Sequence, residues 1–205
     1  MTLKLFKSPQ LPRPPAEYDS EYMSQLIRAV DLYFTQLDNG KRTNRITESA
    51  YGEFWSETDQ TSAGTTSENI FTLEEIEYSN LITVQSNTQI TFEQPGYYFL
   101  TTHAHFANTG TAVQDVDIWL KKSGTNLPDS RTRMTVSARK SAGVPSYIAT
   151  TNTHLLRIDD ITQYIQIAWW TDGTSVQAEY IAAGTSPTRP QIPSIDVEVI
   201  FVSAL

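Results

Sequence analysis

The chain has 205 residues, a mass of 23.1 kDa, 39% hydrophobic residues and a net charge of −8. This length fits one sizeable domain with or without an appendage. The absence of cysteine excludes a disulfide framework and a thiolate metal site. Membrane insertion is not expected, because the longest apolar run is far shorter than the roughly 20 residues that span a bilayer. Prolines also interrupt the N-terminus too early for a signal peptide.

The charge is unevenly placed along the chain. Residues 1–45 hold seven Lys and Arg against five Asp and Glu, a net of +2, whereas residues 46–205 hold eight against 18, a net of −10. Contacts to phosphates need clustered Lys and Arg, so nucleic acid is not an expected partner of this acidic body. The acidity serves solubility at least as readily as a specific function.

Residues 1–15 contain four prolines and are predicted to form an extended, partly polyproline-like arm. This composition is equally typical of a flexible leader and of a peptide that becomes ordered on a partner.

Residues 16–40 are predicted to form an amphipathic helix. Acidic residues at its start suit the positive end of the helix dipole, and Asn39-Gly40 supplies a stop signal. Such an apolar face must bury against the body, against sister helices or in a partner's groove, and we expect oligomerisation or particle docking. The apolar residues of this face are Tyr22, Met23, Leu26, Ile27, Val30, Tyr33, Phe34 and Leu37.

Residues 41–50 are predicted to be a linker, and residues 51–205 a single β-rich domain. Residues 96–130 show the clearest pattern: Val116, Ile118 and Leu120 alternate with polar neighbours, and Gly and Asn clusters bound the run. Roughly ten short strands with regular turns predict an antiparallel sandwich or barrel, whose apolar last strand is central. The other expected strands are 51–55, 70–73, 81–84, 89–92, 132–137, 147–156, 161–170, 176–181 and 195–202.

His103 and His105 are two residues apart on a predicted strand, so both rings should point to the same face of the sheet. They are weak metal candidates, because a site needs further ligands and the third histidine, His154, is distant in sequence. Paired polar or stacking side chains are the commoner explanation. No metal and no cofactor are therefore expected.

No catalytic motif is found. Two carboxylate pairs, Asp115 with Asp117 and Asp159 with Asp160, resemble the acid pairs of glycosidases only in composition. The sequence has no Gly-x-Ser-x-Gly nucleophile elbow and no phosphate-binding glycine loop. The protein is therefore predicted not to be an enzyme.

Trp119, Trp169 and Trp170, with Tyr180, suit either a sugar-stacking surface or a protein interface. Trp169 and Trp170 are adjacent, so they should point to opposite faces of a strand and at least one should lie outside the core. An interface is the commoner role of an outward tryptophan.

Several segments of residues 51–205 resemble the tumour necrosis factor and complement-type jelly roll in the version found in bacteriophage virion proteins. The matching segments are 95–99 (PGYYF), 116–125 (VDIWLKKSGT), 127–130 (LPDS), 161–170 (ITQYIQIAWW) and 190–195 (PQIPSI). Two departures are Ser123, where asparagine is usual, and residues 137–147, which match nothing. Residues 14–38 also look like a leader that recurs in phage structural proteins.

The resemblance implies an antiparallel jelly-roll sandwich, preceded by the helix and the arm, that assembles as a homotrimer. It implies a virion protein, assembled in the host cytoplasm, whose residues 1–40 dock on the capsid, the portal or tail, or a fibre-anchoring protein. The favoured function is a trimeric head fibre, decoration protein or accessory spike. The alternative is a tail-associated receptor-binding tip that recognises a glycan or protein of the host cell surface, and a polysaccharide hydrolase is the weakest reading.

Overall fold

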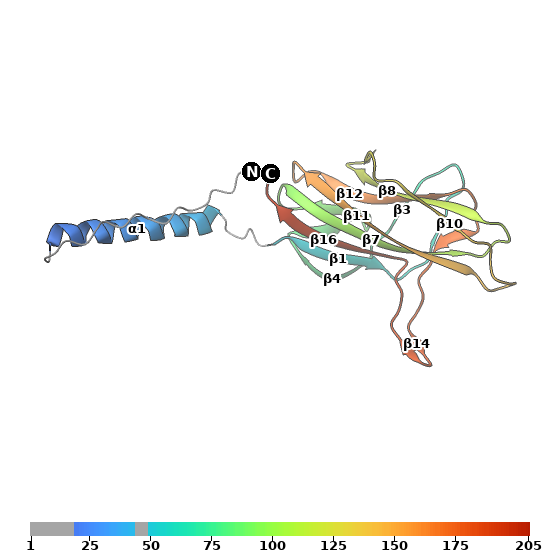
Figure 1. Cartoon of the computed structure of the whole chain (residues 1–205). Helices are drawn as coiled ribbons and strands as arrows, with labels where there is room; N and C mark the ends of the chain where they lie inside the picture. Colours follow the sequence, from blue (N-terminus) through green and yellow to red (C-terminus); the bar gives the residue numbers. More distant parts are fainter. Residues whose placement is uncertain (1–18, 44–48) are drawn as a thin grey trace. The chain divides into compact units, whose positions relative to one another are not determined.

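The computed structural model describes residues 19–43 and 49–205, and the chain divides into two units, Met1–Glu48 and Ser49–Leu205 (Figure 1). The predicted proline-rich arm and the first residues of the predicted helix lie outside the described residues. Within the described residues, no helix combines the length and the apolar character needed to cross a membrane.

The described part of the first unit forms one helix, α1 (Ser20–Thr43). Asp19 caps it, because its side chain accepts a hydrogen bond from the backbone N–H of Glu21 at 2.9 Å and its carbonyl accepts one from Met23 at 3.2 Å. The predicted end at residue 40 is wrong, since the helix continues through Gly40 to Thr43. A single glycine costs about 1 kcal/mol in a helix, which is insufficient to end one where no proline follows. The predicted linker therefore begins later than residue 41.

The second unit is a sandwich of two antiparallel sheets (Figure 1). Sheet A has the strand order β4-β1-β16-β7-β11, and β13 and β2 extend it beside the far end of β7. Its strands are β1 (Tyr51–Ser56), β2 (Gln60–Thr61), β4 (Glu75–Asn80), β7 (Gly96–Asn108), β11 (Ser146–Ile158), β13 (Val176–Ala178) and β16 (Ile195–Ser203).

Sheet B has the strand order β10-β8-β12-β6-β5, with β3 beside β12 and β9 beside β8. Its strands are β3 (Asn69–Ile70), β5 (Ile82–Gln85), β6 (Gln89–Phe92), β8 (Gln114–Lys122), β9 (Thr125–Asn126), β10 (Thr132–Val136) and β12 (Tyr164–Thr171). A separate hairpin of β14 (Gly184–Thr185) and β15 (Thr188–Arg189) projects from the sandwich between β13 and β16 (Figure 1).

The strand order is that of a jelly roll. The main strands in chain order are β1, β6, β7, β8, β10, β11, β12 and β16; numbered 1 to 8, they give 1-8-3-6 in sheet A and 2-7-4-5 in sheet B. The chain thus crosses repeatedly between two sheets, as in the double Greek key of jelly rolls. The predicted fold class is confirmed, and the last strand is central, between β1 and β7.

The core fills the space between the sheets with side chains from alternate strand positions. On β7, Tyr98, Leu100 and Phe106 point inward and are fully buried, as the period of two in a strand requires. Trp169 lies in an aromatic cluster with Phe106 and Phe71, at ring-centroid distances of 5.5 and 5.8 Å. The described buried core residues run from Ala50 to Val199, so the second unit has a hydrophobic core of its own.

The predicted strands differ from the structure in several places; β13, for example, covers only Val176–Ala178 of the predicted strand 176–181. Residues 75–80 form edge strand β4, which sequence analysis missed because the segment is acidic and its side chains are almost all exposed. Of the predicted strand 70–73, only Ile70 is paired, in β3; Phe71 and Leu73 are buried without belonging to a strand.

Candidate functional site

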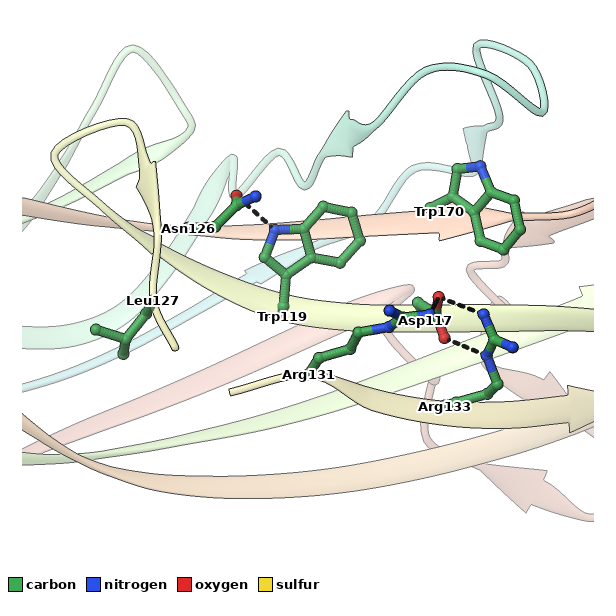
Figure 2. A pocket seen from close by; sticks show the side chains of 7 residues that line it. All are labelled: Asp117, Trp119, Asn126, Leu127, Arg131, Arg133 and Trp170. Atoms are coloured by element: carbon green, nitrogen blue, oxygen red, sulfur yellow. Dashed lines mark hydrogen bonds and ion pairs between the residues drawn. The ribbon is translucent and has the colours of Figure 1, made fainter. Parts of the chain in front are cut away.

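The outer face of sheet B carries a pocket that we call the Trp–Arg pocket. Its cavity of about 370 Å³ is within the range of small-ligand sites. Three of its residues lie in register across neighbouring strands: Trp170 on β12 and Arg133 on β10 both pair with Asp117 on β8. The lining residues are Asp117, Trp119, Asn126, Leu127, Arg131, Arg133 and Trp170 (Figure 2).

Asp117 organises the polar side of the pocket. Its carboxylate accepts hydrogen bonds from Arg133 Nε at 2.8 Å and Nη2 at 3.0 Å, and from Arg131 Nη2 at 2.5 Å. The two guanidinium groups cover Asp117, whose side chain is 5% exposed, while their own side chains are 60% and 50% exposed for Arg131 and Arg133. Burial raises the pKa of Asp117, but the hydrogen bonds and charges of both arginines outweigh it, and the pKa lies below its ordinary value.

The two outward indoles are fixed by their N–H groups. Trp119 Nε1 donates to Asn126 Oδ1 at 2.9 Å, and Trp170 Nε1 donates to the carbonyl of Thr65 at 2.6 Å. Asn126 lies on β9, which pairs with β8 after the turn at Ser123 and Gly124, both of which have positive φ. The ring faces, and not the N–H groups, are therefore the parts of Trp119 and Trp170 that remain for a ligand.

The loop that walls the pocket is held by Ser130. Its hydroxyl accepts a hydrogen bond from Leu120 N–H at 3.0 Å and donates one to the carbonyl of Leu127 at 2.8 Å. Asp129, in the same loop, has φ of +61°. The segment 127–130, noted in the sequence for its resemblance, thus holds Leu127 in the pocket wall.

Trp169 does not belong to this surface. It points inward, as its alternation with Trp170 requires, and it is fully buried between the sheets. The expectation that Trp169 is an interface residue is therefore wrong, whereas Trp119 and Trp170 remain partly exposed on the outer face.

The outer face of sheet A carries a different feature, which we call the apolar row. Tyr51 on β1 pairs with Ile200 on β16, Ile200 pairs with Phe99 on β7, and Phe99 pairs with Leu155 on β11. The four residues are 41%, 53%, 46% and 58% exposed in the same order. Tyr78 on β4, 54% exposed, extends the row through an edge-to-face contact with Tyr51 at 6.0 Å. Large exposed apolar patches of this kind mark interaction surfaces.

Polar residues follow the apolar row on the same face. Two and four residues beyond Tyr51 on β1, Glu53 lies opposite Glu198 of β16 and Trp55 lies opposite Asp196. Glu53, Asp196 and Glu198 have carboxylate oxygens within 4.8 Å of one another, the one such group of three potential ligands among the described residues. Burial, then the charge of Glu53, raises the pKa of Asp196 to about 6.

His103 and His105 both lie on this outer face of β7, but each ring has its own partner. His103 Nδ1 is 2.9 Å from Thr151 Oγ1, and His105 Nδ1 is 3.1 Å from the carbonyl oxygen of Glu179. The His105 ring also stacks on Tyr147, with centroids 5.3 Å apart. His103 pairs with Asp196 across β7 and β16, but neither histidine belongs to the group of three carboxylates among the described residues.

The predicted docking face of α1 is only partly described. Met23, Ile27 and Phe34 are exposed, at 37%, 57% and 58%. Tyr22, Leu26, Val30 and Tyr33 are half-buried, and the side chain of Leu37 lies outside the described residues. The role expected of this face in oligomerisation or docking remains a prediction.

No protein-family model and no curated protein matches the sequence. Among solved structures, the chain is similar to Eiger TNF from S. frugiperda, with a TM-score of 0.49 and 5% sequence identity, over 77% of this chain and 94% of that chain. The jelly-roll assignment rests on the strand order described above.

Proposed function

We propose that this chain is a non-enzymatic structural protein of a bacteriophage virion. In this proposal it forms a homotrimer that serves as a head fibre, decoration protein or accessory spike and is assembled in the host cytoplasm. The virion role is supported by the sequence segments that resemble phage jelly-roll proteins. The observation that supports self-association is the apolar row on sheet A.

The apolar row suits a second copy of the chain better than an unrelated partner. Residues 46–205 carry a net charge of −10, so copies repel one another over most of their surfaces. The row itself contains no charged residue, and this repulsion is weakest there. Its four side chains are about half exposed in one copy, and burying the remainder contributes about 1 kcal/mol per side chain, or about 4 kcal/mol per copy.

The experiment that tests self-association compares two substitutions on the same face. Phe99→Asp places a charge in the middle of the apolar row, whereas Thr153→Asp places one on β11 in the neighbouring row, at an exposed position opposite Thr101. Light scattering should give about three times 23.1 kDa for the full-length protein and for Thr153→Asp, and a smaller mass for Phe99→Asp. A full-length protein that is monomeric, or a Phe99→Asp variant that remains trimeric, would refute the proposed interface.

The N-terminal segment is proposed to attach the protein to the particle, through the capsid, the portal or tail, or a fibre-anchoring protein. Because the second unit has its own core, deletion of residues 1–48 should leave a folded body. This truncated protein should be missing from purified particles that contain the full-length protein. Normal incorporation of residues 49–205 would contradict the anchoring role.

A second candidate function, a receptor-binding tip, is favoured by the Trp–Arg pocket. Sheet B faces away from the apolar row, so this pocket would remain open in a trimer assembled through sheet A. Copy number separates the two functions, because a decoration protein occurs many times per particle and a tail tip only a few times.

A further inference from the structure

The Trp–Arg pocket has a chemistry that the proposed structural role does not require. Asp117 is buried on the outer face of a sheet, a position where an aspartate is normally solvated, and two arginines close over it. Two tryptophans stand beside them (Figure 2), and both of their N–H groups are already bonded. A surface that served solubility alone would need none of these contacts.

The polar groups available in the pocket are mainly donors. Both Asp117 oxygens already accept hydrogen bonds from the arginines, and Asn126 Oδ1 accepts one from Trp119. Arg131 uses one N–H of Nη2 in these bonds, so its Nε, its Nη1 and the second N–H of Nη2 remain to donate, together with the amide nitrogen of Asn126. A ligand that satisfies this pocket must therefore bring acceptors.

The charge of the pocket favours an anionic acceptor. Two arginines and one aspartate leave the lining residues with a net charge of +1, whereas residues 46–205 together carry a net charge of −10. Asp115 offsets Arg133 in part, with its oxygen 3.9 Å from Nη1, whereas Arg131 has no ion pair besides Asp117 among the described residues. Planar guanidinium groups bind carboxylates through two parallel hydrogen bonds.

The indoles supply the other half of the recognition. Trp119 and Trp170 project from the neighbouring strands β8 and β12, and their π faces are electron-rich and apolar. The C–H face of a sugar ring is complementary to such a surface. The cavity volume of about 370 Å³ accommodates one or two sugar rings and not a long chain.

We infer that the Trp–Arg pocket binds an acidic saccharide, with a sugar ring against Trp119 and Trp170 and a carboxylate on the free N–H groups of Arg131. A glycan of this chemistry on the host cell surface would make the jelly roll a recognition module as well as a structural one. The inference does not depend on the trimer, because all seven lining residues belong to one copy.

The test is titration of the full-length protein, labelled with ¹⁵N, with three methyl glycosides of acidic sugars: glucuronic acid, galacturonic acid and N-acetylneuraminic acid. Methyl glucoside is the neutral control, because it differs from the glucuronide only by the carboxylate. At least one acidic glycoside should shift the indole N–H signals of Trp119 and Trp170 and leave that of Trp55, on the outer face of sheet A, unchanged. Its affinity should exceed that of its neutral counterpart by about tenfold or more.

A matched pair of arginine variants tests the carboxylate contact. Arg131 and Arg157 have side chains that are both 60% exposed and both paired with an aspartate. Arg131→Gln should remove the preference for the acidic sugar, and Arg157→Gln should leave it intact. Asp117 keeps its two bonds to Arg133 in the first variant, so the fold is retained.

Three results would overturn the inference: no indole shift with any of the three acidic glycosides, equal affinity for the neutral glycoside, or an unchanged preference in Arg131→Gln. Tighter binding of an acidic peptide through the same residues would replace the saccharide with a protein ligand and overturn it as well. Light scattering of Arg131→Gln is measured alongside. If Arg131→Gln loses sugar binding and remains a trimer, the pocket is separable from the assembly. If the full-length protein binds the sugar without being a trimer, the inference stands and the proposed assembly fails.

Discussion

Asp117 should contribute more to stability than any other carboxylate on the outer face of sheet B, and Asp117→Asn tests this directly. The substitution removes the charge from a side chain that is 5% exposed and accepts three hydrogen bonds from two arginines. Breaking a buried ion pair costs about 3 to 5 kcal/mol. Here the arginines are half exposed and can be rehydrated, so we expect a loss of about 2 kcal/mol in the free energy of unfolding.

The assay is urea unfolding of the full-length protein at one fixed protein concentration, because assembly itself alters apparent stability. Asp115→Asn is the matched control: Asp115 lies on the same strand and face, is partly exposed, and is 3.9 Å from Arg133. Since the pKa of Asp117 is lowered, the stability that it contributes is present above its ordinary pKa of 3.8 and is lost as the pH falls through its folded value. Equal effects of the two substitutions at pH 7 would refute the role given to Asp117.

Three further substitutions test the core, the carboxylate group and a close backbone contact, each by urea unfolding. Trp169→Ala should lower the free energy of unfolding by about 4 kcal/mol, because it empties a fully buried site. Trp170→Ala should lower it much less, and similar losses for the two variants would contradict the opposite orientations of the two side chains. Asp196→Asn should raise the free energy of unfolding by about 1 kcal/mol above pH 6, because a pKa of about 6 means that the folded protein disfavours the charged carboxylate, and partial exposure screens this penalty. The gain should vanish near pH 4, where the carboxyl group of Asp196 is neutral in the folded protein. A gain that does not change with pH would contradict this electrostatic explanation. Gly96→Ala should lower the free energy of unfolding by about 2 kcal/mol, because the added Cβ would lie 2.8 Å from the carbonyl oxygen of Ser203. An unchanged urea midpoint would show that this contact is not close.

The parts of the fold that depend on a single strand could be predicted from the sequence. Alternation places Val116, Ile118 and Leu120 in the core and Trp119 on the outer face, as observed. The apolar last strand, β16, is central as predicted, since it pairs with β1 on one side and with β7 on the other. Side chains alternate with a period of two in any strand, so these predictions need no knowledge of which strands pair.

The sites could not be predicted, because they depend on the register between strands. The apolar row consists of one residue from each of four strands, and Tyr51 and Ile200 are far apart in the chain. Asp117 looks like an ordinary solvent-facing residue in its own strand, and only the pairing of β8 with β10 places Arg133 over it. A weak signal was present, since four of the eight Lys and Arg of residues 46–205 fall between positions 121 and 133.

The central claim, that sheet A carries the assembly, is tested most directly by the mass in solution of the isolated body, residues 49–205, measured by light scattering. We expect three copies, because the apolar row lies wholly within this unit. In that case α1 is free to dock on the particle. A monomeric body beside a trimeric full-length protein would contradict the claim and would assign assembly to the helix.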